Sequence, residues 1–184
     1  MQTVVCVGGG PSLTAADVDA CRDQTVIAIN DSYRLAPWAT ALYAADARWW
    51  ALHQGVPSFL GTKYACQRGA EPWGPTVLKN LGMLGWSDDP AGVFTGGHSG
   101  YQAIQVAAHL GATRIVLLGY DVQASAEGKM HWHENPTRQP FARWVKTYAT
   151  LAAAALERGI EIVNCSRETA LTDFPRRSLA ETLG

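Results

Sequence analysis

Residues 3–12 read Thr-Val-Val-Cys-Val-Gly-Gly-Gly-Pro-Ser, and this segment is the clearest indication of the fold class. Its apolar half, Thr3–Val7, predicts a buried strand, and the glycines that follow predict a sharp turn. Thr14 can then cap a helix predicted over 15–22, with Asp17 three residues later completing a pair that resembles a capping box. A strand that enters a helix through a glycine-rich turn is typical of a parallel sheet covered by helices.

The rest of the chain continues this alternation of apolar runs and helix-patterned segments. We expect one α/β domain over 1–184, a Rossmann-like fold whose mostly parallel sheet has helices on both faces. Two parts depart from the pattern: an irregular insertion around 53–90, with a short strand near 58–60, and a histidine-containing loop around 122–140. Further strands are predicted over Thr25–Ile29, 40–45, Arg114–Leu118 and 161–163, and longer helices over 99–110 and 141–158.

The composition narrows the class of protein. The 184 residues include 17% charged residues and carry a formal net charge of −1, which argues against non-specific nucleic-acid binding. Cys6, Cys21, Cys66 and Cys165 form no CxxC pair, so we expect free thiols in a reducing compartment. No apolar run reaches the roughly 18 residues needed to cross a bilayer, and the first residues lack a signal-peptide pattern. These features predict a cytoplasmic protein without membrane attachment, and the low charge favours a homo-oligomer.

Small polar residues follow several of the predicted strands. The carboxyl ends of parallel strands meet at one edge of the sheet, and this is where open α/β folds bind ligands. We therefore expect the candidate site at that edge. Five segments are predicted to converge there: 8–12, 30–33, Asp46, 119–121 and 164–166.

Two glycine-rich segments each precede a predicted helix. Gly8, Gly9, Gly10 and Ser12 follow the first strand, where exposed backbone N–H groups could hold an anion. The segment 95–100, which contains Ser99 and Gly100, precedes the helix over 99–110. Two such helix starts facing one crevice suit a diphosphate or a nucleotide. Either segment could instead serve structure alone, the first as a sharp turn and the second with Ser99 as an N-cap.

Two histidines lie in the loop around 122–140. In an extended segment His131 and His133 point to the same face, with Trp132 pointing away into apolar packing. An imidazole titrates near neutral pH, so either ring could act in acid–base catalysis or bind a phosphate. A metal site is not expected, because the HExxH spacing is absent and only two spaced imidazoles are evident. The remaining interpretation is that both histidines lie on the surface and have no chemical role.

The other large aromatic and histidine side chains are assigned no chemistry. His53 and His109 have the pattern of ordinary helix residues. Five tryptophans are read as core or interface residues rather than as platforms for stacked bases. They are Trp49, Trp50, Trp73, Trp86 and Trp144.

The order of these motifs resembles the bacterial CMP-sialic-acid-dependent sialyltransferases and the related MptE-like group, in a compact form like that of some phage and prophage proteins. That family has a strand followed by G-x-G-P-S-L, a strand ending in Asn, an S-G that begins a helix, a strand ending in G-x-D, and a downstream histidine. The matching residues here are 7–13, Asn30, Ser99 with Gly100, 118–121, and His131 or His133.

The resemblance implies roles for individual residues. Gly8, Gly10, Ser12, Asn30, Ser99 and Gly100 would line a nucleotide pocket, and His133 or His131 would be the general base. This chain has Gly9 where the sialyltransferases have Asn, it has little room for their acceptor-covering lid, and their paired phosphate-binding tyrosines are not evident, although Tyr120 is near. Nucleotide binding is therefore implied more directly than sialyl transfer.

These observations predict a transferase, similar to a glycosyltransferase, that binds a nucleotide or nucleotide-sugar with the help of a histidine. Candidate catalytic residues are His133, His131 and Asp121, and Asp46 and Tyr120 join the residues expected to bind the nucleotide. No cofactor is required in this reading, and the acceptor is unspecified. One alternative is a pyrophosphokinase-like transferase that uses ATP and Mg²⁺, with Asp46 and Asp121 as cation ligands. Another is a non-catalytic nucleotide-binding accessory protein of a phage.

Overall fold

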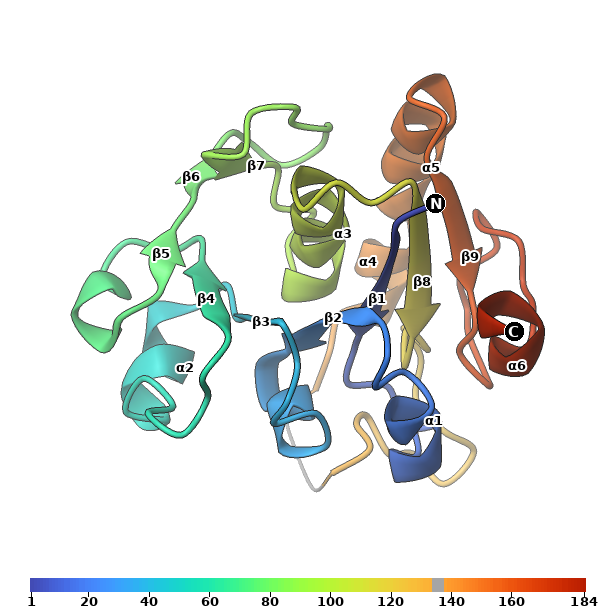
Figure 1. Cartoon of the computed structure of the whole chain (residues 1–184), viewed down its shortest axis with the longest axis horizontal. Coiled ribbons are helices and arrows are strands. Elements are labelled where there is room, and N and C mark those ends of the chain that lie inside the picture. Colours follow the sequence, from blue (N-terminus) through green and yellow to red (C-terminus); the bar gives the residue numbers. More distant parts are fainter. Residues whose placement is uncertain (134–137) are drawn as a thin grey trace.

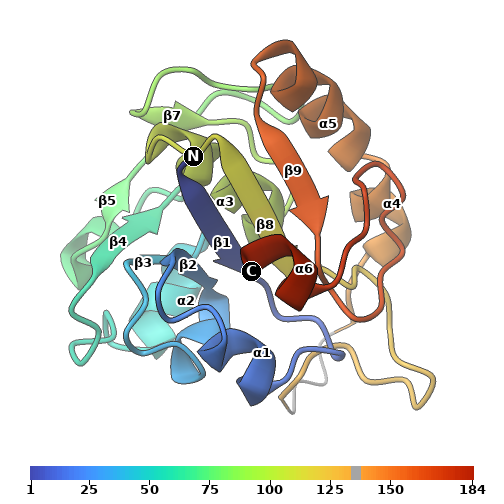
Figure 2. The ribbon, with the colours of Figure 1, turned by 45° about the vertical axis from the view of Figure 1, so that its right-hand side comes forward.

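A computed structural model describes residues 1–133 and 138–184 of the chain. Its centre is a seven-stranded, all-parallel sheet with the order β5-β4-β3-β2-β1-β8-β9 (Figures 1 and 2). β1 (Thr3–Val7) pairs with β2 (Thr25–Ile29) on one side and with β8 (Arg114–Leu118) on the other. The chain therefore leaves β1 in one direction and later returns to its opposite side, which creates the switch point of a Rossmann-like α/β fold.

The remaining strands extend the sheet outwards from this centre. β3 (Ala41–Tyr43), β4 (Thr62–Ala65) and β5 (Thr76–Val77) follow β2, and β9 (Glu161–Asn164) pairs with β8. A separate pair of two-residue strands joins β6 (Lys79–Asn80) to β7 (Gly92–Val93). Two 3-10 helices, η1 (Asn30–Arg34) and η2 (Glu71–Trp73), complete the connections.

Helices cover both faces of the sheet, as predicted. α3 (Ser99–His109), α4 (Phe141–Val145) and α5 (Tyr148–Glu157) pack on the face that carries Val4 and Cys6. α1 (Ala15–Asp19), α2 (Ala47–Leu52) and α6 (Leu179–Leu183) pack on the face that carries Val5 and Val7. Successive β1 side chains thus enter two different cores, because side chains alternate along a strand. Thr14 caps α1 by accepting a hydrogen bond from Asp17 N, as the sequence predicted.

Several elements differ from the predictions. The helix expected over 15–22 ends at Asp19, and the strand expected over 40–45 is limited to Ala41–Tyr43. The strand expected at 58–60 is wrong: residues 56–59 form a turn closed by Phe59 N and Val56 O, and the ladder begins when Thr62 N donates to Thr40 O at 3.0 Å. The helix expected over 141–158 is divided, because Thr147 donates to Trp144 O through its hydroxyl (2.8 Å) and its N–H (2.9 Å) and ends α4. The insertion over 53–90 also contributes β4 and β5 to the main sheet.

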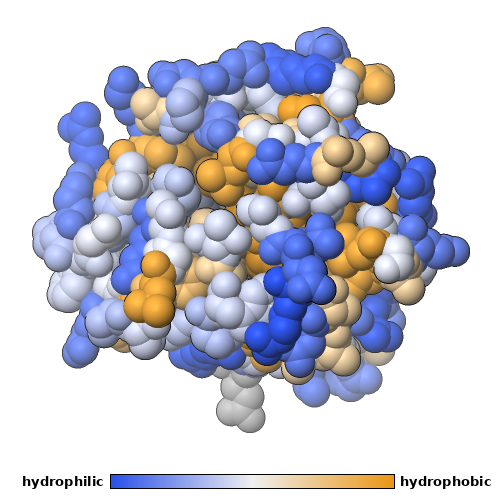
Figure 3. Space-filling view, in the orientation of Figure 1, coloured by the Kyte–Doolittle hydropathy of each residue, from blue (hydrophilic) through white to orange (hydrophobic). Residues whose placement is uncertain are grey.

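The cysteines and the surface can be compared with the expectations from the composition. All four cysteines are buried and unpaired, as expected. Within the described residues, no helix is long and apolar enough to span a membrane. In the face shown in Figure 3, hydrophobic residues lie in separate groups between hydrophilic ones. Several large apolar side chains are also exposed. These include Leu52, Leu60, Leu81, Met83, Leu84 and Leu156.

Candidate functional site

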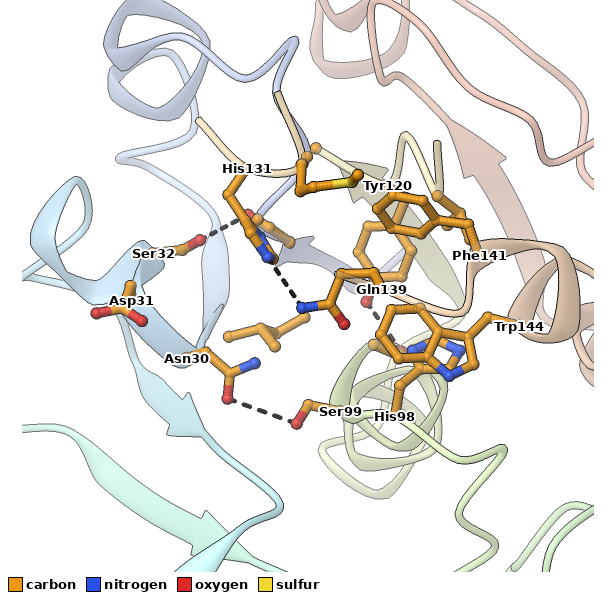
Figure 4. Close-up of a pocket in the computed structure, with 18 of the residues that line it drawn as sticks. Asn30, Asp31, Ser32, His98, Ser99, Tyr120, His131, Gln139, Phe141 and Trp144 are labelled. Atoms are coloured by element: carbon orange, nitrogen blue, oxygen red, sulfur yellow. Dashed lines mark hydrogen bonds between the residues drawn. The ribbon is translucent and has the colours of Figure 1, made fainter. Parts of the chain in front are cut away.

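A cavity of about 350 Å³ lies at the carboxyl edge of the sheet, where the loops after β1, β2 and β8 meet the start of α3. This is the edge predicted from the strand ends. Figure 4 shows Asn30 and Asp31 on one side, Phe141 and Trp144 on the opposite side, and His131 with Gln139 between them. Ten residues named from the sequence line the cavity. They are Gly8, Gly9, Gly10, Asn30, Asp46, Ser99, Gly100, Tyr120, His131 and His133.

The first glycine loop packs against the loop that follows β8. Gly8 N donates to Leu118 O at 2.7 Å and Gly10 N donates to Gly119 O at 2.8 Å. A Cβ on Gly8 would lie 2.6 Å from Gly119 O, so the two backbones approach too closely for a side chain. The prediction that these N–H groups point at an anion is therefore wrong for Gly8 and Gly10. Their conformation serves the close approach of two loops.

Ser12 and Asp121 lie outside the cavity. Asp121 is 1% exposed, and its Oδ2 accepts a hydrogen bond from Ser12 N at 2.8 Å. Burial raises the pKa of Asp121, while the hydrogen bonds from Ser12 oppose that rise. The pair ties the loop after β8 to the loop after β1. Asp121, expected among the catalytic residues, thus occupies a position that supports the cavity from outside.

The second glycine-rich segment forms the start of α3. His98, rather than Ser99, is the N-cap, because its Nδ1 accepts from Tyr101 N at 3.4 Å. Since Nδ1 accepts, the neutral ring carries its proton on Nε2, which is buried and has no partner within the described residues. Burial lowers the pKa of His98 to about 3, so the ring stays neutral near pH 7.

Ser99 joins three elements at the floor of the cavity. Its Oγ accepts from Ala45 N at 3.1 Å, beyond the end of β3, and lies 3.5 Å from Asn30 Oδ1, at the end of β2. Asn30 has a φ of 50°, a left-handed conformation that asparagine tolerates better than most residues. The amide of Asn30 is therefore fixed beside the first turn of α3, as Figure 4 shows.

The two histidines lie together, as their spacing predicted. The His131 and His133 rings stack with centroids 5.4 Å apart, and Trp132 packs against the core that contains Val5 and Val7. His131 Nε2 lies 3.2 Å from Gln139 Nε2. Burial lowers the pKa of His131, and the neighbouring His133 adds to this, whereas the Gly9 carbonyl and Asp31 oppose it.

Asp31 lies in the segment 30–33 that was predicted to converge on the site, but it was not singled out as a site residue. Its Oδ1 lies 3.2 Å from His53 Nε2 and 3.0 Å from an Arg34 nitrogen, and its Oδ2 lies 3.9 Å from His133 Nε2. Trp49 Nε1 donates to the same Oδ2 at 3.4 Å. Asp31 therefore connects α2 to the histidine pair. His53, to which the sequence analysis assigned no chemistry, has Asp31 as its partner.

An aromatic wall was also missed. Trp49 and Trp144, read from the sequence as core or interface residues, line the cavity together with Phe141 and Tyr148. The Trp144 ring packs on His98 with centroids 4.7 Å apart. Phe141, Trp144 and Tyr148 follow the histidine loop closely in the sequence, which could have indicated them, whereas Trp49 carries no such signal.

Comparisons with protein-family models, with curated proteins and with solved structures give no match for this chain.

Proposed function

We propose that the cavity binds a nucleotide or nucleotide-sugar and that the protein is a histidine-assisted transferase, similar to a glycosyltransferase. The observation that carries this proposal is the convergence of Asn30, the start of α3 and the stacked histidines on one cavity at the switch point of a parallel sheet. Its volume of about 350 Å³ falls in the range of small-molecule sites. The motif order that resembles the sialyltransferases gives the reaction class.

The anion-binding part of the cavity is built from neutral donors. Within the described residues, the N–H groups of Ser99 and Gly100 have no hydrogen-bond partner, and the dipole of the 11-residue α3 favours negative charge at this end. Tyr148 is 1% exposed, lines the cavity and makes no hydrogen bond through its hydroxyl within the described residues. A Cβ added to Gly100 would lie 3.2 Å from that hydroxyl, so the hydroxyl lies close to the first turn of α3. Burial raises the pKa of Tyr148 well above its usual value, so it remains a donor.

The charge of the lining favours a ligand with few negative charges. Among the described lining residues there is no lysine or arginine, whereas Asp31 and Asp46 are both present. A phosphate with a single negative charge can be held by a helix start and a tyrosine hydroxyl. A triphosphate would bring more charge than these donors offset. Asn30 and the aromatic wall supply, for the nucleoside, an amide and flat apolar surface.

The stacked histidines are placed to supply the base. In the proposed step, an acceptor hydroxyl oxygen forms a bond to the anomeric carbon of the sugar, and the bond from that carbon to the phosphate oxygen breaks. The phosphate leaves with the electron pair, and the hydroxyl proton passes to a histidine. His133 is the stronger candidate because the Asp31 carboxylate lies 3.9 Å from its Nε2 and can stabilise the imidazolium that forms.

The ATP- and Mg²⁺-dependent alternative depends on Asp46 and Asp121 acting together. Asp46 lines the cavity, but Asp121 is buried outside it and accepts from Ser12 N. These positions give the alternative no specific support.

The proposal is tested by thermal-shift measurements with CMP, UDP, GDP and ADP, followed by turnover of the matching labelled nucleotide-sugar. A ligand that binds only the folded state raises its stability by about 2.7 kcal/mol at 100 times Kd, which a melting curve detects. We expect at least one nucleotide to stabilise the protein and its sugar conjugate to be consumed. Stabilisation without turnover under any acceptor would identify a non-catalytic binding protein instead.

A further inference from the structure

A second hollow, open to solvent, adjoins the first cavity. Asp46 and Trp49 belong to both, so a ligand in one lies next to a ligand in the other. We call this second hollow the α2 groove, because four of its residues are the N-cap of α2 or lie within α2. Its lining consists of Asp46, Arg48, Trp49, Leu52 and Gln67.

One wall of the α2 groove is an aromatic ring held in a fixed orientation. The Trp49 ring stacks on His53 with centroids 4.1 Å apart, and the edge-on Trp50 lies 5.1 Å away. Trp49 Nε1 donates to Asp31 Oδ2 at 3.4 Å. Leu52 extends the apolar surface and is 77% exposed. A fixed indole beside an exposed leucine offers a flat apolar surface without a cost in side-chain ordering.

The polar residues of the α2 groove provide both donors and acceptors. Asp46 is exposed and makes no capping hydrogen bond at the start of α2. Arg48 is exposed and forms no ion pair or hydrogen bond within the described residues. Gln67 Oε1 accepts from Ala47 N at 2.9 Å, so its amide nitrogen is left to donate elsewhere. One carboxylate and one guanidinium also cancel in formal charge.

These groups match the chemistry of an uncharged saccharide. A sugar ring presents a face of C–H groups that packs on an indole, and a rim of hydroxyls that donate to a carboxylate and accept from a guanidinium or an amide. We propose that the α2 groove binds a saccharide and is the acceptor subsite for the first cavity. Its assignment as an acceptor subsite rests on the proposed function, whereas saccharide binding itself does not.

The test is saturation-transfer NMR with four probes, the methyl glycosides of galactose, glucose, mannose and N-acetylglucosamine, each with and without a saturating nucleotide. We expect at least one probe to bind. The Arg48→Ala and Gln67→Glu variants should each weaken that binding by about tenfold, the loss expected for one hydrogen bond to a charged or amide group. Gln67→Glu keeps the acceptor for Ala47 N, removes the amide donor and adds one negative charge to the groove. Arg68→Ala is the matched control, because Arg68 is an exposed arginine next to Gln67 that does not line the groove.

Thermal shift with nucleotides on the same samples separates the two claims. Saccharide binding that depends on Arg48 or Gln67 supports the α2 groove even if no nucleotide binds, and in that case the proposed function fails alone. Nucleotide binding without any saccharide signal overturns the α2 groove and leaves the proposed function standing. Saccharide binding that is unchanged in both variants also overturns the assignment, because the sugar would then lie elsewhere.

Discussion

Gly10 and Asp121 lie so close that a Cβ on Gly10 would overlap the Asp121 carboxylate. The same Cβ would lie 2.7 Å from Gly119 O, a backbone atom that cannot move aside. The contact sits where the loops after β1 and β8 meet, at the switch point of the sheet. The glycine-rich loop is therefore constrained first by packing, and the shape of the cavity depends on that packing.

Gly10→Ala should accordingly destabilise the protein. Overpacking of a well-packed region costs about 1 to 3 kcal/mol, and contact with backbone atoms puts this site at the upper end. The matched variant is Gly9→Ala, whose Cβ would meet only the His131 ring, 3.3 Å from Nδ1. Urea unfolding should show a large loss for Gly10→Ala and a small one for Gly9→Ala. If both variants lose the same free energy of unfolding, contact with the loop after β8 is not the reason for glycine at position 10.

The buried His98 should make stability depend on pH. Its folded pKa of about 3 lies below the value of about 6.5 expected in the unfolded chain, so the unfolded state binds the proton more readily. The stabilising contribution is complete above pH 6.5 and is lost as the pH falls toward 3, by up to about 1.4 kcal/mol per pH unit.

We expect the His98→Asn variant, which retains a capping side chain, to lack this loss. The measurement is the free energy of unfolding of both proteins between pH 7 and pH 4. The wild type should lose stability relative to the variant as the pH falls. A difference that stays constant over this range would show that His98 has the same pKa in the folded and unfolded states.

Asn30→Ala should weaken nucleotide binding and leave the fold intact. The loss of one buried hydrogen-bond partner costs about 1 to 3 kcal/mol in binding. Because Asn30 has a φ of 50°, alanine also adds backbone strain, so Asn30→Gly is the control that removes the side chain without it. Calorimetric titration should give the same weakened affinity for both variants. An affinity equal to that of the wild type would reduce Asn30 to a turn residue.

The two histidines should differ in their effect on turnover. If His133 is the general base, His133→Asn should lower kcat by about 10² to 10⁴ while nucleotide affinity changes little. His131→Asn should lower it less, because His131 Nε2 already faces Gln139 at 3.2 Å. Single-turnover kinetics with the nucleotide-sugar identified by thermal shift would measure both. The reverse order of effects would assign the base to His131, and loss of stoichiometric zinc in both variants would replace the base by a metal site.

The fold was predictable where strands are buried on both faces. β1, β2 and β8 match the predicted ranges to the residue, because continuous apolar runs closed by glycine or polar residues leave little choice. β4 was missed because Thr62 and Lys63 are exposed or half-buried and its pairing to β3 is a tertiary contact. No local pattern in the insertion specifies that contact.

The candidate site was predictable to the extent that it depends on strand ends. Asn30 and Gly9 lie at the cavity because parallel strands end at one edge, and Ser99 lies there as the first residue of α3. The inward or outward direction of Ser12 and Asp121 could not be derived, because it depends on how two loops pack on each other. Trp144 and Tyr148 come from α4 and α5, whose placement over the cavity depends on the loop that precedes them.

The most direct test of the nucleotide pocket is a calorimetric titration of CMP, UDP, GDP and ADP into the wild type and into Tyr148→Phe. We expect at least one nucleotide to bind with one site per chain, and we expect the variant, which lacks only a hydroxyl, to bind it about 5- to 150-fold more weakly. If the wild type binds none of the four nucleotides, the proposed nucleotide pocket is wrong. If the Tyr148→Phe variant binds the nucleotide with unchanged affinity, the proposed phosphate position at the start of α3 is wrong.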